Sequence, residues 1–406
     1  MPVAPSGRAE RAPWRHFART PGNGPAAVRD LLSAIGLPED VLGASHASVA
    51  RVVGPAVASA LLARDAQRDE AIERSLDWAE SPGHHLIALI DPGYPQRLLQ
   101  IADPPALLFV DGDPAVLGRQ ALAMVGSRSA SRSGVETAEA FARAFGQAGL
   151  AIVSGLAAGI DAAAHRGALA TAGGTLAVLG TGVDTVYPSQ NLPLAQAIVA
   201  QGGALVAEVP LGTGPRKANF PRRNRLIAGL SLGVLVVEAA LRSGSLITAR
   251  LAAEFGREVF AIPGSIHSPL SKGCHQLIKQ GARLVESAQD VLGELPAGGA
   301  PAPGTAPADR PPGEAPAPQV RGPEDPSRRA EPDDRSCRSE PGDPADVAVL
   351  AALGWDPASA ETVAQRLAAG GAAPDAGGLA ARLLELEMRG SVERLNDGRY
   401  QRRPIG

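Results

Sequence analysis

Short apolar runs alternate with segments of helix length from Leu107 to about Leu295, and this alternation limits the fold more than any other feature. The runs are LLFV, ALAMVGSR, LAIVSGL, GTLAVLG, ALVAEV, LGVLVVEA and REVFAIPG. Their apolar residues are consecutive, which is typical of strands that are buried on both faces. Such strands, when helices separate them, form parallel sheets covered by helices on both sides. We therefore expect an α/β domain with an extended Rossmann-like, doubly wound parallel sheet over residues 105–295.

The segments on either side of this domain have other patterns. Residues 1–24 are rich in Pro and Arg and are expected to be disordered, whereas helical spacing of Leu, Ile and Val predicts a small helical domain over residues 25–104. Residues 296–343 have almost no large apolar side chain, so burial cannot offset the entropy of folding and we expect a disordered linker. Residues 344–406 predict three short helices and a hairpin with an Asn-Asp-Gly turn, the pattern of a winged helix.

The overall charge excludes a protein that coats nucleic acid with its whole surface. The formal net charge is −3 and the isoelectric point is about 6.2, so any site for a polyanion must be a local patch. Cys274 and Cys337 have neither the number for a disulfide framework nor the spacing of a zinc site, which favours the reducing cytoplasm. No run of about 18 apolar residues predicts a membrane span.

One such patch is evident in KANFPRRNRLIAGLS, from Lys217 to Ser231. No acidic residue occurs between Glu208 and Glu238, although a solvated surface normally mixes both signs. That interval contains the basic residues Arg216, Lys217, Arg222, Arg223 and Arg225, with Asn219, Phe220 and Asn224 among them. Guanidinium groups match phosphate oxygens, and an exposed phenyl ring offers a stacking face to an unpaired base. The segment therefore predicts a site for single-stranded nucleic acid.

Small residues follow several of the predicted strands. In a parallel sheet, ligands bind beyond the carboxyl ends of the strands, and small residues there let backbone N–H groups approach an anion. The loops in question contain Gly126, Ser127 and Arg128, then Ser154 and Gly155, and later Ser243, Gly244, Ser245 and Thr248. We expect these loops to bind the strand together with the basic segment.

A second group of residues is expected to hold the pocket in place. Gly159 lies close to a predicted helix start, and Asp161 and His165 are spaced i, i+4 on that helix, as in a catalytic dyad or, more commonly, a local hydrogen bond that orients the helix. Glu238 ends a strand, where we expect it to orient neighbouring groups because a carboxylate repels an anion.

Motifs for other chemistry are absent from the sequence. There is no GxxxxGK[ST] phosphate loop, GSRSASRSG does not match GxGxxG, and His267, Cys274 and His275 have no acidic residue or second Cys pair beside them. No nucleophile with a paired base can be assembled. We expect no catalysis, no cofactor and no metal site.

Six motifs occur in an order that closely resembles the DNA-processing protein A family (DprA, also called Smf), over roughly residues 100–292. They are GSR at 126–128, SGLAAGIDAAAH at 154–165, YPSQN at 187–191, NFPRRNRLIAGLS at 219–231, VVEAALRSGSLITA at 236–249 and IPGS at 262–265. The resemblance implies a cytoplasmic homodimer that binds single-stranded DNA, protects incoming DNA and loads RecA recombinase in natural transformation and recombination. It also implies a SAM-like N-terminal domain and a C-terminal winged helix, and it carries over Asp161, His165 and Glu238 as scaffold.

Two other functions compete with this one. A phosphoribohydrolase-like enzyme would use Glu238 as acid or base, but such enzymes have a PGGxGTxxE motif that this sequence lacks. A regulator that binds duplex DNA would use the winged helix. Its candidate contacts, interleaved with the acidic residues Glu385, Glu387 and Glu393, are Arg382, Arg389 and Arg394.

Overall fold

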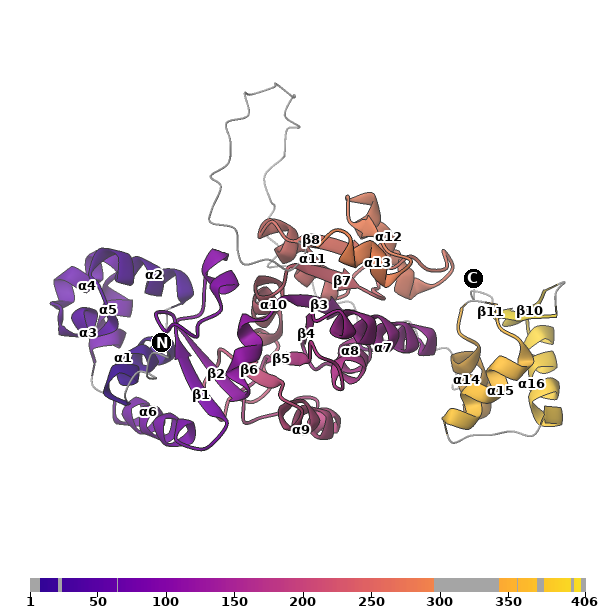
Figure 1. Ribbon diagram of the computed structural model, residues 1–406, viewed down its shortest axis with the longest axis horizontal. Helices are drawn as coiled ribbons and strands as arrows, with labels where there is room; N and C mark the ends of the chain where they lie inside the picture. Colours follow the sequence, from indigo (N-terminus) through magenta and orange to yellow (C-terminus); the bar gives the residue numbers. More distant parts are fainter. Residues whose placement is uncertain are drawn as a thin grey trace, which may run out of the picture. The chain divides into compact units, whose positions relative to one another are not determined.

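The chain forms two compact units, one up to Leu295 and the other over most of the described residues from 343 to 402 (Figure 1). The computed structural model describes residues 8–20, 24–63, 65–295, 343–355, 357–370, 376–395 and 398–402. The expected linker, apart from residue 343, lies outside the described residues. Every helix within these ranges is too short or too polar to cross a membrane.

The first unit is built around a mixed sheet, whose nine strands within the described residues have the order β1-β2-β6-β5-β4-β3-β7-β8-β9. The strands are β1 (His84–Ala88), β2 (Leu107–Gly112), β3 (Ala121–Val125), β4 (Ala151–Ser154), β5 (Thr175–Leu179), β6 (Ala204–Ala207), β7 (Gly233–Val236), β8 (Glu258–Ala261) and β9 (Arg283–Leu284). From β6 to β9 all neighbours are parallel. The Rossmann-like α/β fold is therefore confirmed for this part.

The edge formed by β1 and β2 differs from the expectation. The run LLFV does form β2, but β2 pairs antiparallel with β6 on one side and with β1 on the other. The strand β1 lies within residues 25–104, which we expected to be helical throughout. Periodicity cannot separate a short apolar run such as Leu86–Ala88 in a strand from one in a helix, and only the pairing with β2 settles it.

Helices cover both faces of this sheet, as the continuous burial along the strands requires. Leu122 and Met124 of β3 face the helices α7 and α8, whereas Ala123 and Val125 face α10 and α11. The helices after β3 are α7 (Arg132–Gln147), α8 (Ile160–Ala168), α9 (Leu192–Ala200), α10 (Asn219–Leu230), α11 (Ser245–Glu254), α12 (Lys272–Lys279) and α13 (Ala288–Leu292). The basic segment thus lies on α10, one of the helices that pack against the strands.

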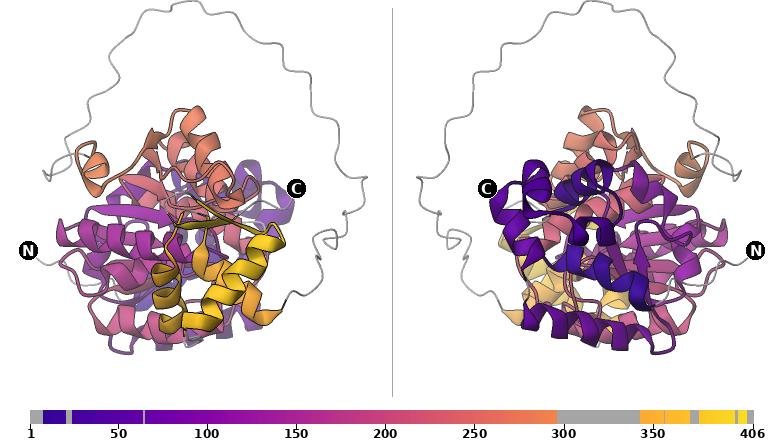
Figure 2. Two further views of the ribbon diagram at one scale, coloured as in Figure 1. Left: turned by 90° about the vertical axis from the view of Figure 1, so that its right-hand side faces the viewer. Right: turned by 90° about the vertical axis from the view of Figure 1, so that its left-hand side faces the viewer.

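Six short helices within the described residues precede the sheet, and they appear in indigo and violet in the right-hand view of Figure 2. They are α1 (Arg8–Arg19), α2 (Pro25–Ala34), α3 (Pro38–Gly43), α4 (His46–Val53), α5 (Pro55–Leu62) and α6 (Ala66–Ala79). The expectation of disorder over residues 1–24 is wrong for α1. Trp14 and Phe17, three residues apart on one helix face, are buried in the same cluster as Leu86 and Phe109 of the sheet. Two aromatic side chains anchor a helix whose composition alone suggested a disordered tail.

The second unit has the three helices and the hairpin that the sequence predicts (Figure 2, left, yellow). Its elements are α14 (Pro344–Leu353), α15 (Ala360–Ala369), α16 (Ala376–Met388), β10 (Val392–Arg394) and β11 (Tyr400–Arg402). Leu353, Val363 and Leu383 are fully buried between the helices. This small core is typical of a winged helix.

The packing of α1 predicts a large effect of one substitution. Phe17→Ala is expected to lower the free energy of unfolding of the first unit by roughly 3 kcal/mol, because it removes a fully buried phenyl ring. Ile90→Ala, which shortens a side chain that is 56% exposed, is the control and is expected to have a much smaller effect. Urea unfolding followed by circular dichroism measures both. An equal, small effect of the two substitutions would mean that α1 does not contribute to the core.

Candidate nucleic-acid interface

The predicted site residues gather at the carboxyl edge of the parallel strands. In the sheet, β3 lies between β4 and β7. The chain therefore goes from β3 through α7 to β4 on one side of β3, and it returns later to place β7 on the other side. In open sheets of this kind, the loops separate at such a reversal of strand order and leave a crevice for ligands. The loops that follow β3, β4 and β7 contain Arg128, Gly155 and Glu238, respectively.

Asp161 organises the loop after β4. Its carboxylate accepts hydrogen bonds from the backbone N–H groups of Gly155 at 3.1 Å and Ala157 at 3.4 Å. Burial raises the pKa of Asp161, against the opposing effect of the Arg223 guanidinium. The same loop contains Gly159 at φ +76°, where a Cβ would collide with the carbonyl oxygen of Ser127. The Asp161 carboxylate therefore fixes the conformation of this loop by accepting hydrogen bonds from its backbone.

His165 is not the partner of Asp161. Its Nδ1 lies 2.7 Å from the Thr175 hydroxyl at the start of β5, and the imidazole is fully buried. Burial, with help from nearby arginines, lowers the pKa of His165 to about 3, so the ring is neutral at pH 7. Of the two alternatives for the i, i+4 pair, the catalytic dyad is ruled out by these different partners, and His165 links α8 to β5.

Arg223 lies beneath the loop after β4. Its Nη1 donates a 2.6 Å hydrogen bond to the carbonyl oxygen of Val178, and its guanidinium occupies the space that a Cβ on Gly155 would need. Burial lowers the pKa of Arg223 to about 10, while Asp161 acts in the opposite direction. We expected Arg223 to face DNA. The structure instead places it as the support that joins the ends of β4 and β5, with part of its side chain lining a hollow above.

That hollow has a volume of about 160 Å³ and lies between the loop after β4 and the start of α10. The ring of Phe220 lies 5.6 Å from the ring of Tyr187, and the guanidinium of Arg128 lies 5.7 Å from the centre of the Phe220 ring. Tyr187 is 46% exposed. Phe220 is partly buried, with its ring against Gly180. An exposed ring and a partly buried one beside a cation can receive a flat, electron-rich group.

Sequence reasoning missed Tyr187 as a site residue. The motif YPSQN contributed only to the family resemblance, although an aromatic residue in a loop was a usable signal in a chain with just 3% aromatic residues. Its proximity to Phe220, 33 positions later, depends on the fold.

The remaining basic residues of the segment divide into two groups. Arg216, Lys217 and Arg222 are exposed. Arg225 is buried, with its Nη1 donating to the Asp103 carbonyl oxygen at 2.6 Å and its Nη2 lying 2.5 Å from Glu208 Oε1. Burial with carboxylate and carbonyl partners means that Arg225 is not available to a phosphate. Asn219 begins α10, and Asn224 donates a 3.3 Å hydrogen bond to the carbonyl oxygen of Gly244.

Glu238 contacts the residue before the start of α7. One carboxylate oxygen accepts from the Ser131 hydroxyl at 2.5 Å and the other from the Ser131 backbone N–H at 2.9 Å. Its backbone carbonyl accepts from Ser127 N–H at 2.7 Å. Gly126 packs against Ile160, so a Cβ there would collide with it. Glu238 therefore holds the loop after β3 against the loop after β7.

Several of the predicted contact residues point into the protein. The Ser154 hydroxyl is buried and donates to the Met124 carbonyl oxygen at 2.6 Å, and Thr248 is only 1% exposed. The hydroxyls of Ser243 and Ser245 lie 2.6 Å from each other, with Gly244 exposed between them. The expectation that all of these groups face a ligand does not fit this placement for Ser154, Ser245 and Thr248, whose side chains pack inside the protein.

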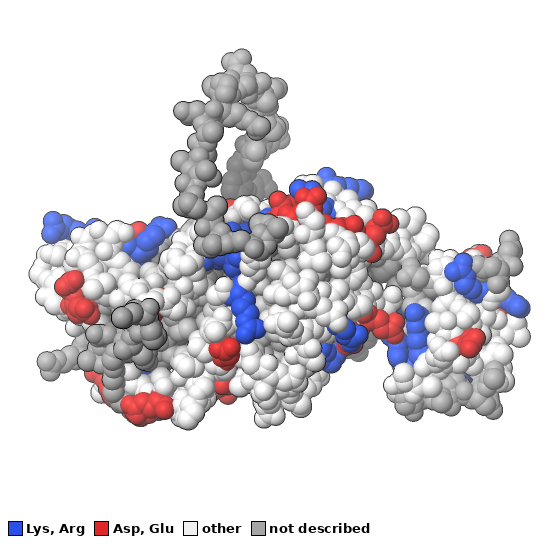
Figure 3. All heavy atoms as spheres, in the orientation of Figure 1, with Lys and Arg blue, Asp and Glu red and all other residues white. Residues whose placement is uncertain are grey.

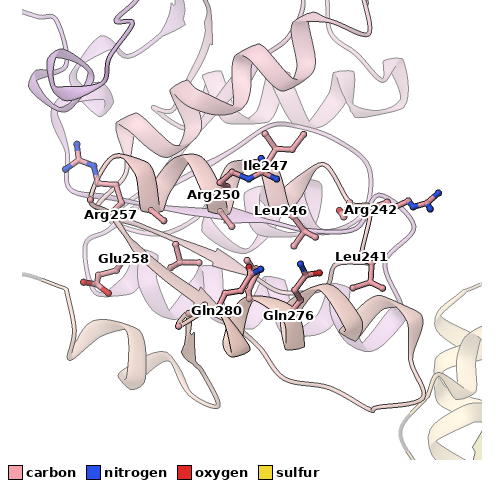
Figure 4. A pocket seen from close by; sticks show the side chains of 17 residues that line it. Leu241, Arg242, Leu246, Ile247, Arg250, Arg257, Glu258, Gln276 and Gln280 are labelled. Carbon is pink, nitrogen blue, oxygen red and sulfur yellow. The ribbon is translucent and has the colours of Figure 1, made fainter. Parts of the chain in front are cut away.

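A larger groove, with a volume of about 730 Å³, lies between α11 and α12 (Figure 4). Gln276 and Gln280 extend from α12 toward α11, whereas Arg242 and Arg257 point away from each other at the two ends. Of the predicted contact residues, Ser243 lines the groove.

The basic character of the surface is local, as the net charge of −3 requires. On the face drawn in Figure 3, Lys and Arg side chains form small separate groups among uncharged surface, with Asp and Glu nearby. Within the part of the chain that the structure describes, no three His, Cys, Asp or Glu side chains gather as metal ligands do.

Two stretches of the chain match known families. Residues 85–296 match DNA recombination-mediator protein A, and residues 326–398 match the DprA winged helix domain. The chain is 51% identical to Protein Smf of Escherichia coli over 243 residues, which is 59% of this chain and 65% of that protein. It is 49% identical to DNA processing protein DprA of Streptococcus pneumoniae over 208 residues, which is 51% of this chain and 73% of that protein.

The fold is also similar to a solved structure. The X-ray structure of DNA processing protein A from Streptococcus pneumoniae superposes with a TM-score of 0.61 at 38% identity, covering 70% of this chain and 97% of that chain. The family match takes in more than half of the chain, and it spans the sheet from β1 to β9. The chain therefore belongs to the DNA recombination-mediator protein A family.

Proposed function

We propose that the first unit binds single-stranded DNA across the carboxyl edge of its sheet, with unpaired bases on Phe220 and Tyr187 and phosphates on Arg128, Lys217 and Arg222. The observation that carries this proposal is the exposed ring of Tyr187 and the partly buried ring of Phe220, 5.6 Å apart, with a guanidinium 5.7 Å from the Phe220 ring. Bases in a duplex are stacked on each other, so only a single strand can offer a base to such rings.

Burial supports a division of labour within the basic segment. Arg223 and Arg225 hold the loops and α10 in position through carbonyl and carboxylate partners. The exposed cations before α10, Arg216 and Lys217, and the half-exposed Arg222 within it can attract the DNA backbone, and a flexible single strand can follow them. The wild-type affinity then combines base stacking with a salt-dependent phosphate contribution.

Family membership supports the wider role. We propose that the protein acts in the cytoplasm as a homodimer that protects incoming single strands and loads RecA recombinase on them in transformation and recombination. The relatives are named DNA processing proteins. No catalytic step is part of this proposal, since both carboxylate oxygens of Glu238, the candidate acid or base, accept hydrogen bonds from Ser131.

The winged helix is not proposed as a reader of duplex DNA. Arg382 lies 2.6 Å from Asp343 and 2.7 Å from Asp346, and Arg389 lies 2.8 Å from Asp346. Arg394 stacks over the ring of Tyr400. The three candidate cations are thus paired within the unit.

Substitution of Phe220 tests the stacking surface. Phe220→Ala is expected to weaken binding of a single-stranded oligonucleotide by about 1–3 kcal/mol, with little change in the slope of log affinity against log salt, because counterions do not screen stacking. Fluorescence anisotropy across a salt series measures both quantities. Ile90→Ala, which also removes exposed apolar surface but lies outside the site, serves as the control. Unchanged affinity of Phe220→Ala would exclude stacking on this ring.

Substitution of Lys217 tests the phosphate contacts. Lys217→Gln is expected to lower the affinity and to reduce the salt slope by roughly 0.7, the contribution of one phosphate contact in a single strand. Lys279→Gln, at an exposed position near the end of α12, is the matched control and should leave both unchanged. If the two variants behaved alike, the cations before α10 would be an ordinary solvated surface.

The assembly is tested separately. A homodimer predicts a sedimentation coefficient for two chains at micromolar concentration, unaffected by Phe220→Ala because this ring serves DNA. Sedimentation velocity of the full chain measures it, and a monomer at these concentrations would contradict the proposal.

A further inference from the structure

One carboxylate lies directly beside the basic segment. Glu208 follows β6, and its Oε1 is 2.5 Å from Nη2 of Arg225 and 3.5 Å from Nη2 of Arg222. The side chain of Glu208 is 14% exposed, whereas that of Arg222 is 50% exposed. A cation that faces solvent at the proposed DNA surface is therefore already paired with an anion of its own chain.

The two arginines depend on Glu208 to different extents. Arg225 has a second set of partners, because it also donates to the Asp103 carbonyl oxygen at 2.6 Å and lies 3.1 Å from the Asp103 carboxylate. For Arg222, Glu208 is the ion-pair partner within the described residues. Arg225 thus holds the Glu208 carboxylate in place at a distance from which it still attracts Arg222.

A phosphate and a carboxylate compete for the same guanidinium. Both are anions with oxygen pairs that match its planar set of donors. A DNA phosphate that approaches Arg222 must either displace Glu208 or remain close to its negative charge. Displacement is opposed by buried Arg225, since the carboxylate would leave a buried cation with only one charged partner.

From this geometry we infer that Glu208 limits the affinity of the proposed DNA surface by competing with a DNA phosphate for Arg222. The inference rests on the proposed function and names a residue that tunes it. A strand bound against such competition dissociates faster than one bound by an unpaired arginine. Glu208 is therefore a positioning residue for Arg225 and an affinity-determining residue through Arg222.

The test is Glu208→Gln in the full chain, with a fluorescent oligo(dT) as the probe. Glutamine keeps an oxygen for Arg225 but removes the charge. The expected result is binding about three- to tenfold tighter than wild type at 0.1 M salt, with a slope of log affinity against log salt that is steeper by up to roughly 0.7. Anisotropy gives the affinity and the slope, and stopped-flow dilution is expected to show slower dissociation.

Asp103→Asn is the matched control. It removes the other carboxylate of Arg225 and leaves Arg222 paired with Glu208. Its thermal stability is expected to fall, as for Glu208→Gln, but its affinity and salt slope should remain those of wild type. In an Arg222→Gln background, Glu208→Gln should give no gain, because two groups that act through one contact are not additive.

The outcomes separate the inference from the proposed function. Wild-type protein that does not bind oligo(dT) would overturn the proposed function itself. Wild-type protein that binds, together with unchanged or weaker binding by folded Glu208→Gln, would overturn only the inference. If Glu208→Gln does not fold, Glu208→Asp keeps the charge but draws the carboxylate back by one methylene, which lengthens the already long 3.5 Å contact to Arg222. Tighter binding by this variant supports the competition, and unchanged binding contradicts it.

Discussion

The arrangement of the proposed site depends on one buried guanidinium. The guanidinium of Arg223 donates a hydrogen bond to the Val178 carbonyl oxygen in β5 and packs against Gly155, just after β4. It also lies close enough to the Asp161 carboxylate to oppose the rise in its pKa. A buried cation without partners is costly, so α10 must bring Arg223 to these groups. The start of the same helix then carries Phe220 to Arg128, in the loop after β3, and to Tyr187, in the loop after β5. The burial of Arg223 thus fixes the position of α10, and with it the positions of Phe220 and of the exposed cations near the start of this helix.

The arginines of this one basic segment therefore have different roles. Arg222, Arg223 and Arg225 lie within one turn of α10, yet one is half-exposed and two are buried with protein partners. Helical periodicity places Arg222 and Arg225 on one face, where both contact Glu208, and turns Arg223 elsewhere into the protein. The difference in exposure between Arg222 and Arg225 comes from tertiary neighbours such as Asp103, which cover Arg225. Arg225 and Glu208 in turn connect α10 to the segment before β2 and modulate Arg222. A count of positive charges overstates the number available to a ligand.

Most strands of the sheet could be predicted because burial on both faces requires consecutive apolar residues, which are visible in the sequence. Strands covered on both faces need apolar runs, and seven such runs mark β2 to β8. Two elements, β1 and α1, were not predicted, each for a different reason. In β1, Leu86–Ala88 is too short for periodicity to identify, and in α1 the two anchoring aromatic residues are surrounded by Arg and Pro. Both are stabilised by contacts with residues far along the chain, such as Phe109, which no local pattern contains.

By itself, the sequence determined the class of the fold, its family, the winged helix and the loops in which the candidate site lies, since these depend on local pattern and on motifs in a set order. The tertiary structure alone decided which of the predicted groups are accessible. It buried Ser154, Thr248, Arg223 and Arg225, and it brought Tyr187 to Phe220 and Glu208 to Arg222. The reason is physical: whether a charge is free to bind a phosphate depends on neighbours that only folding places beside it.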